Sequence, residues 1–140
     1  MPAKDRYHDH VKNALTKDGW TITADPLKLK WKKKPLFIDL AAEQENLLAA
    51  EKGTRKIAVE IKSFIGLSQM NDLYSALGQF ILYREALLQS EPERELYLAI
   101  RQPVFESLFT GAEGESLRER QQLKLIVFDA RNQEVRQWIE

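Results

Sequence analysis

The spacing of hydrophobic positions changes several times along the chain, and these changes predict the order of its helices and strands. Apolar residues at helical spacing predict a first helix over residues 5–18, which Gly19 ends. Residues 20–23 alternate and are rich in β-formers, so a short strand is expected next. Residues 36–40 form a compact apolar run, which predicts a buried strand that carries Asp39.

The clearest strand pattern covers residues 56–64. Ile57, Val59 and Ile61 point to one face of this strand, and Glu60 and Lys62 point to the other, because successive side chains alternate. A carboxylate and an ammonium group therefore lie side by side on an otherwise apolar strand. Buried charges cost several kcal/mol unless they are paired or bind a ligand, so we expect this pair to have a chemical or a structural role.

The remaining segments complete a mixed α/β domain spanning residues 1–140. Ser68 is a favourable N-cap for a long helix that runs to about Ser90, and Pro92 follows its end. The other expected elements are a bend at 44–46, a strand at 47–51, a turn at 52–55, a strand at 96–100, a short helix at 103–109, a loop at 111–114, a helical turn at 117–121, and strands at 123–129 and 135–139.

Composition narrows the class of protein. The chain has 140 residues, of which 44% are hydrophobic and 30% charged, as in an ordinary soluble domain. It has no cysteine, which excludes disulfides, cysteine-ligated zinc and a thiol nucleophile. Its first residues lack the apolar core of a signal peptide, and we expect a cytoplasmic protein. The strands at 123–139 offer an edge through which copies of the chain could associate.

The net charge of the chain does not indicate nucleic-acid binding, but one cluster of lysines does. The 21 basic and 21 acidic residues cancel. A lysine cluster nevertheless surrounds one tryptophan, and its members are Lys28, Lys30, Trp31, Lys32, Lys33 and Lys34. The lysines would contact DNA phosphates while Trp31 stacks on a base. Alternatively, they protect an edge strand from pairing, which the zero net charge favours.

Asp39, Glu60 and Lys62 are the residues that metal-dependent phosphodiester hydrolysis requires. Two carboxylates supply hard oxygen ligands to Mg²⁺ or Mn²⁺, and the backbone carbonyl of Ile61 is a further candidate ligand. Lys62 would orient the attacking water and offset charge on the phosphate oxygens. We expect DNA as the substrate or partner.

This pattern resembles the PD-(D/E)XK nuclease superfamily, in which an acid on one strand precedes Glu-x-Lys on the next. The resemblance implies a restriction-endonuclease-like core in αβββαβ order. Gln79 and Tyr83 resemble the Gln-x-x-x-Tyr signature of one nuclease subgroup, although they are equally typical of a buried amide and a core aromatic. The superfamily often has an acid on its first helix; Asp9, with His8 beside it, is the nearest candidate, and solvated helix positions are the alternative.

Taken together, Asp39, residues 58–64, 76–79 and 96–100 resemble the XisH family, the fdxN element excision controlling factors of cyanobacteria. The resemblance covers nearly the whole chain. It implies a role in excision of a DNA element by a site-specific recombinase, alongside the small companion factor XisI.

The residues leave more than one function open. The first is a Mg²⁺-dependent DNA endonuclease, in which Glu60 and Lys62 take part in cleavage. The second is a non-catalytic accessory factor that keeps the scaffold and binds DNA or a protein, in which Glu60 and Lys62 form a buried ion pair. A third is a nuclease that a partner protein silences.

Overall fold

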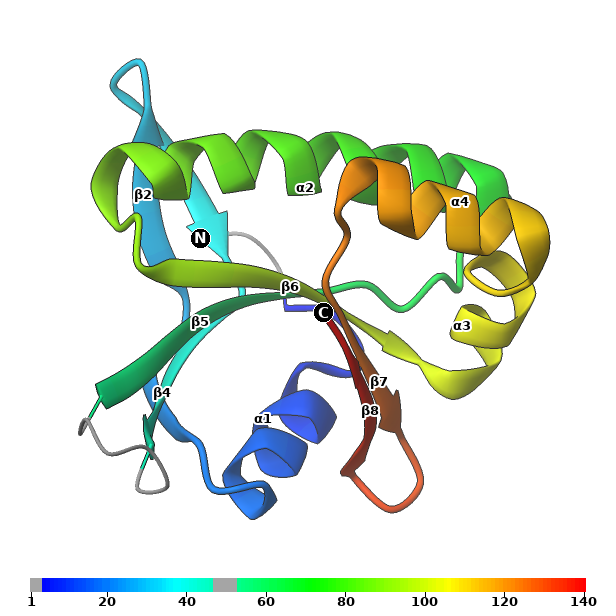
Figure 1. Cartoon of the computed structure of the whole chain (residues 1–140), viewed down its shortest axis with the longest axis horizontal. Coiled ribbons are helices and arrows are strands. Elements are labelled where there is room, and N and C mark those ends of the chain that lie inside the picture. The colour runs from blue at the N-terminus through cyan, green and yellow to red at the C-terminus, as the bar shows by residue number, and fades with distance from the viewer. Residues whose placement is uncertain (1–3, 47–52) are drawn as a thin grey trace.

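A mixed six-stranded sheet forms the centre of the molecule, in the order β1-β4-β5-β6-β7-β8, and a separate two-stranded sheet is formed by β2 and β3 (Figure 1). The computed structural model describes residues 4–46 and 53–140. None of the helices in those two segments is long and apolar enough to cross a membrane. The elements are α1 (His8–Lys17), β1 (Thr21–Ala24), β2 (Leu27–Trp31), β3 (Lys34–Ile38), β4 (Leu40–Asn46), β5 (Gly53–Ile61), α2 (Gln69–Ser90), β6 (Arg94–Arg101), α3 (Gln102–Leu108), α4 (Gly111–Gln121), β7 (Leu125–Asp129) and β8 (Glu134–Ile139).

Strand β5 lies inside the sheet, antiparallel to β4 and parallel to β6. Its alternating side chains enter two different cores: Ala58 packs with residues of α2, whereas Ile57, Val59 and Ile61 pack with residues of α1. Helices α2 and α1 thus cover opposite faces of the sheet (Figure 1). By the same alternation, Glu60 points away from Ile57, Val59 and Ile61, as the sequence predicts, and therefore to the face that α2 covers.

Helix α2 confirms the prediction for its start and its length. The Oγ of Ser68 accepts a hydrogen bond from the N–H of Asn71 at 3.2 Å, which satisfies one of the free N–H groups of the first turn. Leu73, Ala76 and Phe80 are buried against the sheet.

The lysine cluster forms the β2–β3 hairpin, which lies beside α2 (Figure 1). Leu29 and Ile38 are buried in the core on the α2 side. Lys32 and Lys33 form the turn, with φ of 47° and 71°. The cluster is therefore a hairpin whose apolar residues pack inward, and not an edge of the main sheet.

Three predictions between β3 and β5 are wrong. The apolar run 36–40 is divided, because β3 ends at Ile38, Asp39 lies at the junction and Leu40 begins β4. The predicted bend at 44–46 is strand, because β4 pairs with β5 in unbroken register as far as the Asn46 and Gly53 pair. For the same reason 53–55 is strand and not a turn. The predicted strand at 47–51 lies outside the described residues.

The predicted loop at 111–114 is also wrong, because these residues begin α4. The two glycines suggested a loop, but Gly114 lies where the helix contacts the backbone of Phe109. A Cβ at Gly114 would lie 2.3 Å from the carbonyl carbon of Phe109, so close packing explains this glycine. Elsewhere the first helix begins at His8 and not at residue 5, and the strand predicted at 56–64 ends at Ile61, because the chain leaves the sheet there and Phe64 has a φ of 55°. The remaining predicted strands and the short helix agree to within two residues.

Candidate active site

Asp39 and Glu60 lie side by side, because the register between β4 and β5 brings them together. Leu40 pairs with Val59, which places the preceding Asp39 next to Glu60. The N–H of Asp39 donates a hydrogen bond to Oε1 of Glu60 at 3.2 Å, and the N–H of Ile61 donates to Oδ2 of Asp39 at 2.8 Å. Each carboxylate is therefore fixed by a backbone group of the other segment.

Burial and the neighbouring charge of Asp39 both disfavour a negative charge on Glu60. Glu60 is only 6% exposed. Burial, and next to it the charge of Asp39, raises the pKa of Glu60 from 4.5 to about 9. Nearby Lys62 lowers the pKa of Glu60, but burial and Asp39 outweigh it. At neutral pH the Glu60 carboxyl therefore holds a proton unless a cation takes its place.

Lys62 follows the last residue of β5 and completes the cluster. Its Nζ lies 3.8 Å from Oε2 of Glu60, and its side chain is 24% exposed. Its N–H donates to the carbonyl of Ala99 at 3.1 Å, which holds the backbone against β6. The ammonium group thus lies between the site and solvent, where it can meet a ligand that arrives from outside.

Helix α2 brings Gln79 and Tyr83 toward this face of the sheet. Burial and the charges of Glu60 and Asp39 raise the pKa of Tyr83 to about 12, so its hydroxyl lies in the field of both carboxylates and stays protonated. Gln79 lies one helical turn earlier on the same side of α2. Its Oε1 is buried and has no hydrogen-bond partner among the described residues, which leaves an acceptor free for a ligand.

His8 and Asp9 are not brought to this site. Both belong to α1, which covers the opposite face of the sheet. His8 is buried, and its Nε2 lies 2.7 Å from Oδ1 of Asp25, whose Oδ2 accepts a hydrogen bond from Lys12 at 2.8 Å. His8 therefore belongs to a local polar cluster, and Asp9 is exposed on the helix surface.

Two residues that the sequence did not single out hold the segment after Lys62. Oδ2 of Asp5 accepts a hydrogen bond from the N–H of Ser63 at 3.1 Å, and Nη2 of Arg101 donates to the carbonyl of Ser63 at 2.9 Å. The N–H and the carbonyl of Ser63 are thus both fixed. These hydrogen bonds span 58 and 38 residues, so no local pattern could have indicated them.

The donor set fits a hard divalent cation. Asp39 and Glu60 would be the carboxylate ligands, and no group of three or more His, Asp or Glu side chains that could hold a metal ion occurs in residues 4–46 and 53–140. Mg²⁺ is commonly held by one or two carboxylates, with waters and phosphate oxygens completing its octahedron. The N–H of Ile61 points toward Asp39, and the carbonyl of a strand residue points to the same side, which keeps Ile61 a candidate ligand.

Comparison with known proteins identifies the family. The family model described as "XisH protein" matches residues 1–136. No sequence among the curated proteins matches the chain. A crystal structure of an XisH family protein from Nostoc punctiforme superposes with a TM-score of 0.85 at 39% identity, covering 97% of this chain and 100% of that one. An fdxN element excision controlling factor protein from Anabaena variabilis gives a TM-score of 0.84 at 38% identity, covering 98% and 100%. The chain belongs to the XisH family.

Proposed function

We propose that this protein hydrolyses phosphodiester bonds of DNA at Asp39, Glu60 and Lys62 with a bound divalent cation, and that this activity supports excision of a DNA element. The second part follows the name of the Anabaena variabilis relative, an fdxN element excision controlling factor. A site-specific recombinase and a companion factor would act with it.

The observation that carries the proposal is the forced proximity of two carboxylates on neighbouring buried segments. Backbone hydrogen bonds at 3.2 and 2.8 Å hold the two carboxyl groups together, although burial and the charge of Asp39 disfavour the charged form of Glu60. A divalent cation held by both residues would offset the burial and the charge of Asp39 that raise the pKa of Glu60. Such an arrangement is typical of a site that is completed by its cofactor.

Each residue has a role that its position permits. Asp39 and Glu60 would hold Mg²⁺ or Mn²⁺, with the Ile61 carbonyl as a third protein ligand. The bound ion would polarise the phosphate and lower the pKa of a coordinated water. Lys62, partly exposed beside Glu60, would orient the water and stabilise negative charge on the phosphate oxygens. Gln79 Oε1 and the protonated Tyr83 hydroxyl would position these groups.

The order of the elements supports the same proposal. With the β2–β3 hairpin set aside, the chain runs α1, β1, β4, β5, α2 and β6, which is αβββαβ order. This is the order that the nuclease resemblance implies, and the Glu-x-Lys residues lie at the end of its third strand. A scaffold does not by itself establish an activity, so the proposal depends on the site.

A cleavage assay with matched variants tests this function. Supercoiled, linear and branched DNA are incubated with the protein and Mg²⁺ or Mn²⁺, and Glu60→Gln and Lys62→Ala are compared with Glu115→Gln, an exposed carboxylate on α4. We expect cleavage by the wild type and Glu115→Gln, and loss of at least about a hundredfold in the two site variants. DNA binding without cleavage of any substrate would support the accessory factor instead.

A further inference from the structure

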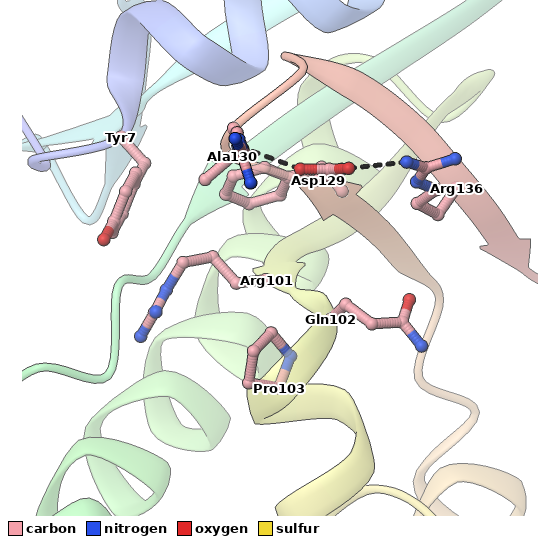
Figure 2. A pocket seen from close by; sticks show the side chains of 9 residues that line it. Tyr7, Arg101, Gln102, Pro103, Asp129, Ala130 and Arg136 are labelled. Carbon is pink, nitrogen blue, oxygen red and sulfur yellow. Dashed lines mark hydrogen bonds and ion pairs between the residues drawn. The ribbon is translucent and has the colours of Figure 1, made fainter.

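A charged cavity, separate from the Asp39 and Glu60 site, lies at the ends of β6 and β7, beside the start of α3 and the N-terminal segment. Its volume is about 630 Å³, within the range of small-molecule sites. Three arginines line it, Arg101, Arg131 and Arg136, together with Tyr7 and Gln102. Figure 2 shows Tyr7 and Arg101 on one side of the cavity and the ion pair of Asp129 with Arg136 on the other.

Asp129, the acidic residue that lines this cavity, already accepts hydrogen bonds from neighbouring residues of the chain. Oδ1 of Asp129 accepts hydrogen bonds from the backbone N–H groups of Arg131 and Asn132 at 2.9 and 3.2 Å. Its Oδ2 accepts from the Asn132 side chain at 3.0 Å and from Arg136 at 2.5 Å. The negative charge of Asp129 therefore neutralises the positive charge of only one of the three arginines, Arg136. The side chains of Arg101 and Arg131 form no ion pair with any carboxylate in the described part of the chain.

Arg101 is held in a fixed orientation with unused hydrogen-bonding capacity. Its Nη2 donates to the Ser63 carbonyl at 2.9 Å, and its guanidinium centre lies 5.0 Å from the centroid of the Tyr7 ring. Its Nε is buried and has no partner among the described residues. A buried N–H without an acceptor costs free energy, so a ligand that supplies an acceptor there is stabilised.

We propose that this cavity binds the phosphate group of a nucleotide or nucleic acid. The Arg101 and Arg131 guanidinium groups offer more donors than the two oxygens of a carboxylate accept, whereas a phosphate presents three or more oxygens. The Gln102 amide donates to Oε1 of Glu106 at 3.0 Å and keeps one further N–H for a ligand. The volume exceeds that of a free phosphate and leaves room for an attached sugar. Binding here does not depend on cleavage at Asp39 and Glu60.

A phosphate bound in this cavity belongs either to nucleic acid or to a free nucleotide, and two probes distinguish these ligands. One arm measures a fluorescein-labelled DNA duplex by anisotropy, and the other measures dAMP by isothermal titration; both contain EDTA, so that no cation site contributes. Arg131→Gln removes one uncompensated charge at an exposed residue, and Arg101→Lys keeps the charge but loses the planar fork. Arg120→Gln on α4 is the control, because it makes the same charge change at an exposed residue outside this cavity.

We expect Arg131→Gln and Arg101→Lys each to weaken binding of the duplex or of dAMP, whichever the cavity binds, about tenfold. Arg120→Gln should bind the same probe within about twofold of the wild type. Dependence in the duplex arm only assigns the site to backbone phosphate, and dependence in the dAMP arm assigns it to a mononucleotide. The proposal is overturned if neither probe binds the wild type, or if Arg131→Gln binds both probes as Arg120→Gln does. Circular dichroism of each variant shows that the fold is retained.

Discussion

The N–H of Asp39 donates a hydrogen bond to Oε1 of Glu60 at 3.2 Å, so that the backbone of one acid holds the side chain of the other. This hydrogen bond joins residues 21 positions apart in the sequence. It fixes two carboxylates together on the face of β5 that α2 covers.

Stability should fall with rising pH because of Glu60. The pKa of Glu60 is raised to about 9 in the folded protein from 4.5, so the folded state holds this proton more tightly than the unfolded chain does. The associated stability is fully present below pH 4.5 and is lost as pH rises toward 9, by at most about 1.4 kcal/mol per pH unit. Urea unfolding at about pH 5, 7 and 9 measures it. Glu60→Gln should flatten this dependence relative to the wild type, and an unchanged slope in that variant would contradict the assignment.

Removal of Lys62 should raise the pKa of Glu60 further. The ammonium group at 3.8 Å lowers that pKa, and a neutral side chain of similar length removes this effect. In Lys62→Met, the side-chain ¹³C titration of Glu60 should therefore shift to higher pH. The free energy of unfolding should change by no more than about 1 kcal/mol, since the pair is partly screened by solvent. A downward shift would show that Lys62 does not face Glu60.

Two glycines of helices should respond to alanine in opposite directions. At Gly114 a Cβ would lie 2.3 Å from the Phe109 carbonyl carbon, so Gly114→Ala should destabilise the protein by about 1–3 kcal/mol. At Gly78, on the exposed side of α2, a Cβ meets nothing within 4 Å. Gly78→Ala should stabilise the protein by about 0.5–1 kcal/mol. Thermal unfolding of both variants measures the contrast, and equal melting temperatures would contradict the packing of α4.

The β2–β3 hairpin should contribute to DNA affinity through its exposed lysines. Replacement of Lys30, Lys32 and Lys33 by glutamine should weaken duplex binding without loss of stability, because the buried residues of the hairpin are Leu29 and Ile38. The slope of log K against log salt should fall by about 0.9 for each DNA phosphate that the variant no longer neutralises. Anisotropy at several salt concentrations measures the slope. An unchanged slope would show that these lysines do not bind DNA phosphates.

Period-two alternation predicted which side chains of residues 57–61 share a face, although it did not predict that the strand ends at Ile61. The acid on the preceding strand together with the Glu-x-Lys spacing predicted that Asp39, Glu60 and Lys62 lie together. Both patterns can be seen in short stretches of sequence, and the pairing of β4 with β5 then brings Asp39 next to Glu60. The Ser68 cap and the long helix were predictable for the same reason. The family resemblance is confirmed, whereas the roles of the site residues stay predictions.

What could not be predicted depends on contacts between distant segments. Glycines at 111 and 114 suggested a loop, because the backbone of Phe109 that excludes a side chain at Gly114 is visible only in the structure. The placement of His8 away from the site depends on which face of the sheet α1 covers, and the sequence leaves that open. Arg101 reaches Ser63 across 38 residues, so neither its orientation nor the cavity beside it could be inferred from spacing.

Calorimetric titration with Mn²⁺ tests the central claim most directly. The wild type should bind a single Mn²⁺ near pH 7 and release about one proton, because Glu60 must ionise to become a ligand; titrations in two buffers with different ionisation enthalpies measure that proton. Asp39→Asn should lose binding, whereas Glu115→Gln should bind as the wild type does. Absence of binding by the wild type, or equal binding by Asp39→Asn, would contradict a metal site between Asp39 and Glu60.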